Sequence, residues 1–394
     1  AGIQISGNQA PNGNGGGIEV IGPATANLGS PDSATGISMV ANNSAMYGGG
    51  VSVDGSDNGT ASLYLFTTDS SRPIGIRNNS ASHTGGGIYL KSGAPTYAAA
   101  VYGWDFRIES NTAPEGAAIY ADVDSNIEGP RGAYVFLGNT TVIGGGFPTS
   151  LGAVHCTNPN LCNTINGNVT TDPSQGSAIL IQDLGYLVAN GFSMRGNHAD
   201  HAIRIVGDHV TVQLFNGLLA GNTLQHELIY ETGSDVPTVI NSCTFANDAI
   251  GASHVIHTES DLTLVDSIIA EPGTLALAYS GNPANLVVNY VLSNDISTLP
   301  NNGTGVALGV PTFVDLAGSD YHLRATSLGI DFAPTTGAGY IANTADLDNK
   351  PRTFDLPAAG NVFGTQDLGV YELQNLFREC GTSDSIFCDG YDHP

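Results

Sequence analysis

Three segments in the middle of the chain place histidine, glutamate, arginine and tyrosine at matching positions of a short β pattern. The segments are HAIRI from position 201, ELIYE from position 227 and HVIHT from position 254. When their central isoleucines are taken as one inward column, the flanking side chains form two further columns. The first column contains His201, Glu227 and His254, and the second, which points outward, contains Arg204, Tyr230 and His257.

These residue types could catalyse the cleavage of an acidic polysaccharide. An outward arginine or histidine would neutralise a substrate carboxylate while a histidine or tyrosine removes a proton, as β-elimination requires. His201, Glu227 and His254 could alternatively share a divalent metal ion. Neither arrangement has a fixed motif, and an exposed strand face also accommodates polar residues that only pair with their neighbours. The noncatalytic interpretation is therefore favoured.

Two other patterns suggest binding. The stretch DVDSNIE spaces oxygen atoms like a calcium loop but lacks the glycine that such a loop needs at its sixth position. A solvated turn is therefore favoured there. No cofactor is expected, with the one alternative that this turn binds calcium through Asp122, Asp124, Asn126 and Glu128. Tyr89 and Tyr120 point outward and could stack on sugars, although aromatic stacking along a sheet is the commoner arrangement.

The composition indicates a β protein. Of 394 residues, 52 are glycine and only 11 are lysine or arginine, which disfavours long amphipathic helices. The formal net charge of -25 would repel nucleic acid, and it disfavours uronate-rich glycans without a local basic patch or a divalent cation. No apolar run reaches the ~18 residues that a membrane-spanning helix needs, so no such helix is expected.

A recurring phrase supplies the elements that would position these side chains. It appears as ISGNQAPNGNGGGIEV, VANNSAMYGGGVSV, IRNNSASHTGGGIYL and IESNTAPEGAAIYA, and in degenerate form in three segments between residues 194 and 259. Each copy has an asparagine three residues after a usually apolar one, then small residues, then a short strand. Later copies recur every 25 residues with three short β runs per cycle, which predicts a parallel β-solenoid.

The asparagine and the glycines of the phrase suit the corners of such a coil. An asparagine amide can satisfy turn backbone groups and bond to the asparagine one turn away, while glycine allows sharp corners and positive φ angles. The predicted ladder comprises Asn43, Asn79, Asn111, Asn197, Asn222 and Asn247, with Asn8 as an earlier member.

The repeat phrase resembles the FxxN and GGA(I/L/V) repeats of polymorphic outer-membrane proteins and, more broadly, secreted bacterial right-handed parallel β-helix proteins. This likeness covers roughly residues 1–290. Further on, VPTFVDLAGSDYHLRATSLGIDFAP, DLDNKPRTFDLPAAG and QDLGVYELQ are similar to the C-terminal signature of choice-of-anchor Q β-helix proteins, and DSIFCDGYDHP resembles short tails of secreted gammaproteobacterial proteins. The resemblance implies a surface or secreted product, with no activity attached.

We therefore predict an all-β fold, a single-stranded right-handed parallel β-helix with an irregular C-terminal cap region. The β-helix spans residues 1–310 with a loop insertion near 150–175, followed by a choice-of-anchor-Q-like region over 311–375 that folds over the last turn, and a tail over 376–394. Disulfides are expected in the loop and the tail, because close cysteine pairs suit an oxidising compartment and lack the spacing of a zinc site. They pair Cys156 with Cys162 and Cys380 with Cys388, which leaves Cys243 as a buried thiol.

Three functions remain open. The preferred one is a noncatalytic secreted or cell-surface protein, structural or adhesive, that contacts an extracellular glycan or cell-surface component. Ala1 resembles a processed start and leaves no residues for an N-terminal cap, so copies could also join head-to-tail into fibres. The alternatives are a polysaccharide lyase or hydrolase acting through the 201–257 face, and a carbohydrate-binding module acting through Tyr89 and Tyr120.

Overall fold

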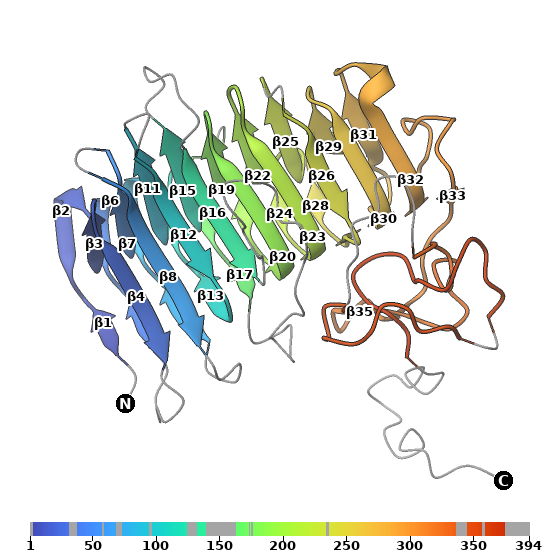
Figure 1. The fold of residues 1–394 in the computed structure, drawn as a ribbon, viewed down its shortest axis with the longest axis horizontal. Coiled ribbons are helices and arrows are strands. Elements are labelled where there is room, and N and C mark those ends of the chain that lie inside the picture. Colours follow the sequence, from blue (N-terminus) through green and yellow to red (C-terminus); the bar gives the residue numbers. More distant parts are fainter. Residues whose placement is uncertain are drawn as a thin grey trace, which may run out of the picture.

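Three parallel sheets wind into a solenoid in the computed structural model (Figure 1). The structure describes residues 3–30, 38–56, 59–67, 73–93, 97–123, 132–138, 163–172, 174, 176–233, 236–335, 345–356 and 359–374. Within these residues the chain is all-β except for the short 3-10 helix η1 (Pro283–Asn285). The predicted β-solenoid is confirmed.

Sheet A is the largest and contributes up to two strands to each turn. Its strands are β1 (Gln4–Ser6), β4 (Thr25–Ser30), β5 (Met39–Ala41), β8 (Ala61–Thr67), β9 (Ile74–Arg77), β12 (Ala99–Gly103), β13 (Phe106–Glu109), β16 (Ala133–Gly138), β17 (Thr164–Asn166), β20 (Tyr186–Arg195), β23 (Thr211–Ala220), β26 (Thr238–Asn241), β27 (Thr244–Ala246), β30 (Leu262–Ala270), β32 (Leu286–Ser293) and β33 (Val306–Leu308).

Sheets B and C complete each turn. Sheet B contains β2 (Gln9–Asn14), β6 (Ser44–Tyr47), β10 (Ser80–Thr84), β14 (Thr112–Ala113), β18 (Val169–Thr170), β21 (His198–Ala199), β24 (Thr223–Leu224) and β28 (Ala249–Ile250). Sheet C contains β3 (Ile18–Ile21), β7 (Val51–Asp54), β11 (Ile88–Ser92), β15 (Ile119–Val123), β19 (Ser177–Gln182), β22 (His201–Val206), β25 (Ile229–Thr232), β29 (His254–Thr258) and β31 (Leu275–Tyr279). A separate antiparallel pair is formed by β34 (Phe313–Asp315) and β35 (Asp320–Leu323).

The apolar residues of the strands form the predicted inward columns. Ile203 pairs with Ile229, which pairs with Ile256, and all three side chains are buried in one continuous core. The loop insertion predicted near residues 150–175 ends earlier than expected, however. Residues 164–170, placed inside it, form β17 and β18 and continue the solenoid, whereas Cys156 and Cys162 lie outside the described residues, as do Cys380 and Cys388. Cys243 is buried with a free thiol, as predicted.

An asparagine ladder runs along the corner between sheets A and B. The backbone and side-chain N–H groups of Asn43 both donate to Oδ1 of Asn79, at 3.0 and 3.1 Å, and Asn79 makes the same pair of bonds to Asn111 at 3.0 and 3.0 Å. The side-chain amide of Asn79 also donates to the carbonyl of Val40 at 3.0 Å, so its donors and acceptor are all engaged. The same pattern connects Asn8, Asn43, Asn79, Asn111, Asn168, Asn197 and Asn222.

The predicted ladder includes one residue that does not belong to it and leaves out one that does. Asn247 does not join it: the two N–H groups of Asn222 donate instead to Oδ1 of Asp248, at 2.6 and 2.8 Å. The physical reason is that each ladder residue follows a residue of positive φ, and Asn247, with a φ of 60°, occupies that preceding place. Asn168, which is not part of the predicted ladder, follows Gly167 in the same way.

A second corner, between sheets B and C, explains the glycine triplets. Gly15, Gly48, Gly85 and Gly116 have φ angles of 63°, 63°, 69° and 58°. A Cβ on the residue after Gly15 would lie 2.4 Å from the carbonyl oxygen of Gly49, because successive turns approach closely at this corner. The turns of Gly15, Gly48 and Gly85 therefore exclude a side chain at the residue that follows each of these glycines.

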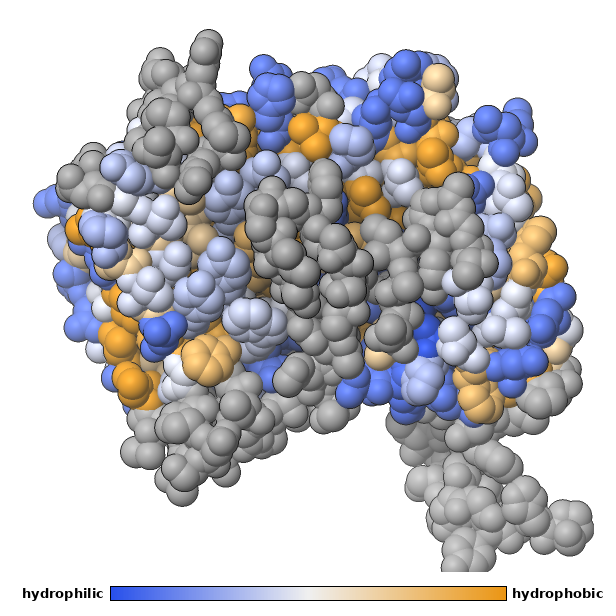
Figure 2. All heavy atoms as spheres, in the orientation of Figure 1, coloured by the Kyte–Doolittle hydropathy of each residue, from blue (hydrophilic) through white to orange (hydrophobic). Residues whose placement is uncertain are grey.

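The C-terminal region packs beside the solenoid and not over its last turn as predicted. Its apolar side chains, including Tyr321, Phe332 and Leu368, pack on outward residues of sheet A such as Leu218 and Ile268 (Figure 1). Over the last turn itself lies the segment that carries Leu299, which is part of the solenoid core. Figure 2 shows that the surface in this orientation is mostly hydrophilic or intermediate, with separate apolar areas.

The three C-terminal signature phrases converge on a buried ionic network. Arg352 is fully buried and donates to the carbonyls of Asp367 and Gly369, at 3.2 and 2.6 Å. The carboxylates of the phrases accept backbone N–H groups across the region: Asp346 from Glu372 at 3.0 Å, and Asp367 from Asp331 at 2.8 Å. These bonds hold the irregular backbone together where no sheet does.

We predict that Asp248→Asn stabilises the protein at pH 8. Burial raises the pKa of Asp248 from 3.8 to about 6, and the carboxyl of Glu271, which accepts the backbone N–H of Asp248 at 3.0 Å, has its pKa raised by burial to about 10. Because the folded state holds the proton more tightly, the contribution of Asp248 to stability is complete below pH 3.8 and is lost as pH rises through about 6.

The gain at pH 8 has an upper bound of ~3 kcal/mol, from a pKa difference of about 2 at 1.36 kcal/mol each. Thermal and urea unfolding at pH 4 and pH 8 measure it. Asn247→Gly is the matched control, since glycine accepts the positive φ there and should leave the pH dependence unchanged. Destabilisation by Asp248→Asn at pH 8 would refute the predicted cost of ionising Asp248 in the folded protein.

Candidate functional site

One outward column runs along the whole outer face of sheet C. The predicted part of it is confirmed, because Arg204 pairs with Tyr230 and Tyr230 with His257 in the parallel register. Toward the N-terminal turns the same register continues through Leu180, Tyr120 and Tyr89 to Ser52 and Glu19. Aromatic and charged residues that are far apart in sequence therefore share one face.

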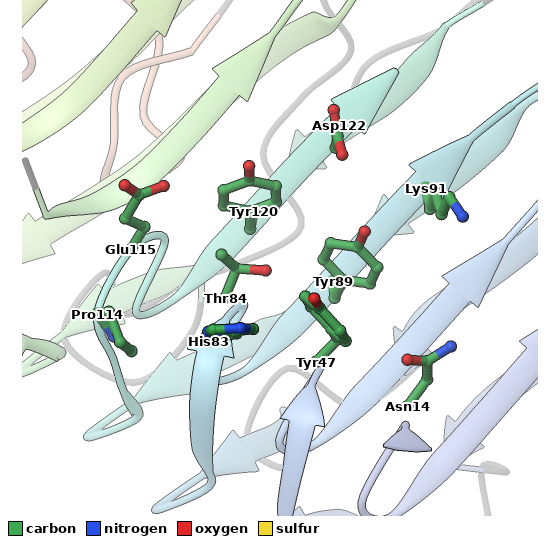
Figure 3. Close-up of a pocket in the computed structure, with 10 residues that line it drawn as sticks. All are labelled: Asn14, Tyr47, His83, Thr84, Tyr89, Lys91, Pro114, Glu115, Tyr120 and Asp122. Atoms are coloured by element: carbon green, nitrogen blue, oxygen red, sulfur yellow. The ribbon is translucent and has the colours of Figure 1, made fainter. Parts of the chain in front are cut away.

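A groove of ≈ 520 Å³ lies on this face over the early turns (Figure 3). One wall comes from residues in register along sheet B and its end, namely Asn14, Tyr47, Thr84 and Glu115. Tyr89 and Tyr120 form the middle, and Lys91 and Asp122, which pair across β11 and β15, line the other side. The lining also includes His83 and Pro114. Its composition is polar and aromatic, as in a site for a hydroxyl-rich ligand.

The tyrosines of the groove stack on one another. The ring centroids of Tyr47 and Tyr89 are 5.3 Å apart, and those of Tyr89 and Tyr120 are 5.6 Å apart. Tyr89 and Tyr120 are only 6% and 8% exposed, so their ring faces cover each other and not a ligand. They present their hydroxyl ends to the groove, pointing the same way in Figure 3.

The hydroxyls of Tyr89 and Tyr120 stay protonated at every physiological pH. Burial is the main cause that raises the pKa of Tyr89 and Tyr120, and the carboxylate of Asp122 adds to it. The Tyr120 hydroxyl donates to Oε1 of Gln182 at 3.0 Å. Across the groove, burial raises the pKa of Glu115 while Arg204 opposes that rise. The groove thus offers both donors and acceptors.

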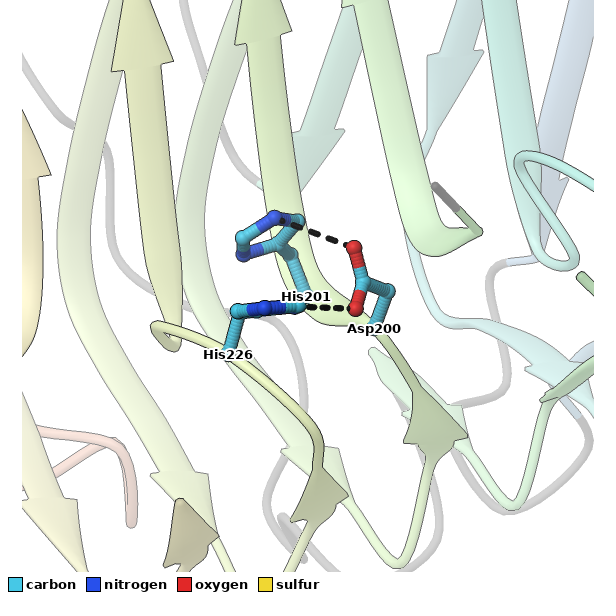
Figure 4. Close-up of side chains that lie close together, drawn as sticks. All are labelled: Asp200, His201 and His226. Carbon is cyan, nitrogen blue, oxygen red and sulfur yellow. Dashed lines mark hydrogen bonds and ion pairs between the residues drawn. The ribbon is translucent and has the colours of Figure 1, made fainter. Parts of the chain in front are cut away.

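A cluster of Asp200, His201 and His226 lies further along the solenoid, at the corner before sheet C (Figure 4). Asp200 and His201 are 2% and 5% exposed, whereas the side chain of His226 is 52% exposed. His201 Nδ1 lies 3.0 Å from the backbone carbonyl of Glu227, and its Nε2 lies 3.3 Å from Asp200 Oδ2. His226 Nδ1 contacts Asp200 Oδ1. The pKa of His201 is lowered, and burial of its ring is the main cause.

The structure only partly assembles the residues that the sequence suggested for catalysis or metal binding. Glu227 Oε2 is 3.8 Å from His201 Nδ1, but His254 contacts Ser253 Oγ at 2.8 Å instead. Asp200 and His226, which join His201, were not selected, because they precede the aligned strand segments and sit in corners. Of the suggested calcium ligands, Asp122 faces the groove, while Asp124, Asn126 and Glu128 lie outside the described residues.

The geometry gives His201 no free route to act as a general base on a polymer. Its ring is buried, both ring nitrogens face protein oxygens, and the ring of Tyr230 stacks on it at a centroid distance of 4.7 Å. Tyr230 in turn lies 5.0 Å from the ring of His257. The rings of His201, Tyr230 and His257 therefore pack against one another along the face of sheet C.

Comparisons with known proteins found no match for this chain. The chain matches no protein-family model, no curated protein and no solved structure. Helices in the described part of the chain fall short of the length and apolarity needed to cross a membrane.

We predict that Tyr230→Ala lowers the free energy of unfolding by about 1–3 kcal/mol, since it removes two ring contacts of ~0.5–1.5 kcal/mol each. Tyr230→Phe keeps both rings in contact and should retain most of the stability. Urea denaturation compares the two variants. An equal loss in both would mean that the hydroxyl, and not the stacked ring, stabilises the column.

Proposed function

We propose that the protein is a noncatalytic, secreted or cell-surface β-solenoid that binds an extended, neutral glycan along the outer face of sheet C. The observation that carries the proposal is the groove over Tyr89 and Tyr120, which lies on the same outward column as Arg204, Tyr230 and His257. A long face with one register suits a long, repetitive ligand better than a compact one.

The chemistry of the groove supports a sugar hydroxyl as the recognised group. The Tyr89 hydroxyl can donate and accept, and the Tyr120 hydroxyl, which donates to Gln182, can accept. Lys91 donates and the carboxylates of Glu115 and Asp122 accept, so the groove can pair with vicinal hydroxyls in either sense. Aligned strands repeat these groups at a spacing of ~4.8 Å. The exposed ring of His83, 5.4 Å from the ring of Tyr47, adds an edge for apolar sugar faces.

The charge of the molecule supports a neutral glycan over an acidic one. The formal net charge is -25, and two carboxylates against one lysine line the groove. A polyuronate would meet repulsion there, whereas a neutral chain meets none.

The noncatalytic and extracellular parts of the proposal are supported by different observations. His201 is buried, and its two ring nitrogens face the Glu227 carbonyl and the Asp200 carboxylate, away from a polymer on the strand face. The repeat phrase resembles those of secreted bacterial β-helix proteins, and the phrases over residues 310–374 resemble an anchoring signature. A surface-held solenoid of this kind would serve adhesion or the structure of an extracellular layer.

The test is the affinity for glycans on an array, followed by titration calorimetry with the best neutral oligosaccharide. Tyr89→Phe/Tyr120→Phe removes two hydroxyls and leaves the stacked rings in place, so binding should weaken about 10-fold or more. This follows from ~0.5–1.5 kcal/mol for each lost hydrogen bond and 1.4 kcal/mol for each factor of ten.

The matched control is Tyr64→Phe/Tyr102→Phe, which removes two hydroxyls from a stacked pair on sheet A, 4.7 Å between ring centroids. It should bind as the unmodified protein does. Absence of binding to every neutral glycan, turnover of any glycan, or equal weakening by both double variants would each contradict the proposal.

A further inference from the structure

We infer that Asp200, His201 and His226 form a binding site for one divalent transition-metal ion, with zinc as the best match. The inference is independent of the proposed glycan groove, which lies over earlier turns of the solenoid. It rests on the orientation of one imidazole, on the spacing of the ligand atoms and on where the repeat phrase changes.

The orientation of His201 leaves a lone pair for a cation. Its Nδ1 donates to the Glu227 carbonyl, 3.0 Å away, so in the neutral ring the lone pair is on Nε2. That lone pair faces Asp200 Oδ2, which is also an acceptor, at 3.3 Å. A metal ion bonded to both atoms satisfies them together, and a histidine that donates its other nitrogen to a backbone carbonyl is the usual arrangement of a metal ligand.

The spacing of the atoms suits a tetrahedral ion. Zinc bonds to nitrogen and oxygen at ~2.0–2.1 Å, and the tetrahedral angle then separates two ligand atoms by about 3.3 Å. His201 Nε2 and Asp200 Oδ2 are 3.3 Å apart. The candidate ligand atoms of all three residues lie within 4.8 Å of one another, and Figure 4 shows both histidine rings on the Asp200 carboxylate.

The ligand set selects the class of metal. Two imidazoles and one carboxylate favour zinc or a similar transition metal over calcium or magnesium, which take oxygen ligands. Three protein ligands leave a fourth position for water. The half-exposed His226 gives the ion access from solvent, while the buried Asp200 holds the inner side.

The residue at this corner changes from glycine in the early turns to residues with longer side chains in the later turns. Asp200 and His226 stand three residues before the inward column at Ile203 and Ile229, the place that Gly48 and Gly85 hold in early turns. Those glycines have positive φ, and the positive-φ residues among the described ranges do not include Asp200 or His226. Gly176 of the preceding turn and Ser253 of the following turn also lie outside that positive-φ set. The later turns therefore admit side chains at this corner, and in two adjacent turns those side chains, Asp200 and His226, are potential metal ligands.

The test is metal binding by the full chain after chelator treatment and removal of the chelator. Calorimetry with zinc chloride should give one ion per chain, and the melting temperature should rise with zinc. Cobalt(II) should give the visible bands of a tetrahedral nitrogen and oxygen site without a thiolate charge-transfer band, which separates this site from any cysteine site.

His226→Gln and Asp200→Asn should each weaken zinc binding at least 10-fold, and His226→Gln is tolerable for folding because its side chain is half exposed. The matched control, His254→Gln, alters a histidine of the next turn outside the cluster and should bind normally. The inference is overturned if the unmodified protein binds no zinc at 1 mM, if the cobalt spectrum shows thiolate ligation only, or if both cluster variants bind as tightly as the control.

Discussion

Every side chain on this solenoid meets its counterpart in the next turn, because parallel strands stack at a fixed spacing of ~4.8 Å. A column is stable only if the residues that are neighbours in it are compatible with one another. Isoleucine satisfies this inside, asparagine at the corner and tyrosine on the outer face, where Tyr89 stacks on Tyr120 at 5.6 Å. Carboxylates do not satisfy it, and burial beside each other keeps Glu271 protonated next to Asp248, with a pKa of about 10.

The same constraint divides the outer surface between structure and recognition. The outward face of sheet A in the later turns is apolar and packs on the C-terminal region, through residues such as Leu218 and Tyr321. The outward column of sheet C instead carries hydroxyls, imidazoles and charges. Function is accordingly expected on sheet C and on the corner that leads into it, where the Asp200 cluster replaces glycine.

The sequence pattern predicts the residues that share a column in the regular strands. It does not predict contacts in the irregular corners and in the C-terminal region. The inward column at Ile203 and the outward one at Arg204 follow from alternation and a constant period. The repeat phrase predicts Asn247 as the ladder residue because the other ladder residues are asparagines. The structure shows that the ladder residue is the one that follows a residue of positive φ, which here is Asp248. Contacts such as Asp200 with His226 join corners 26 residues apart in irregular segments, and no strand pattern reports on them.

The structure of the C-terminal region could not be predicted from the sequence either, for a different reason. Its phrases were recognised as a unit by resemblance, but the convergence of Arg352 with the Asp367 and Asp346 carboxylates depends on a fold without periodicity. Its docking beside the solenoid is equally non-local, since the hydroxyl of Thr244 accepts the backbone N–H of Val370 at 3.0 Å across 126 residues.

The most direct measurement of the account is a crystal structure of the protein soaked with a neutral oligosaccharide. The account predicts sugar density along the outer face of sheet C, with ring hydroxyls within hydrogen-bond distance of Tyr89, Tyr120 and Lys91. Density confined to sheet A or to the C-terminal region, with sheet C bare, would contradict it.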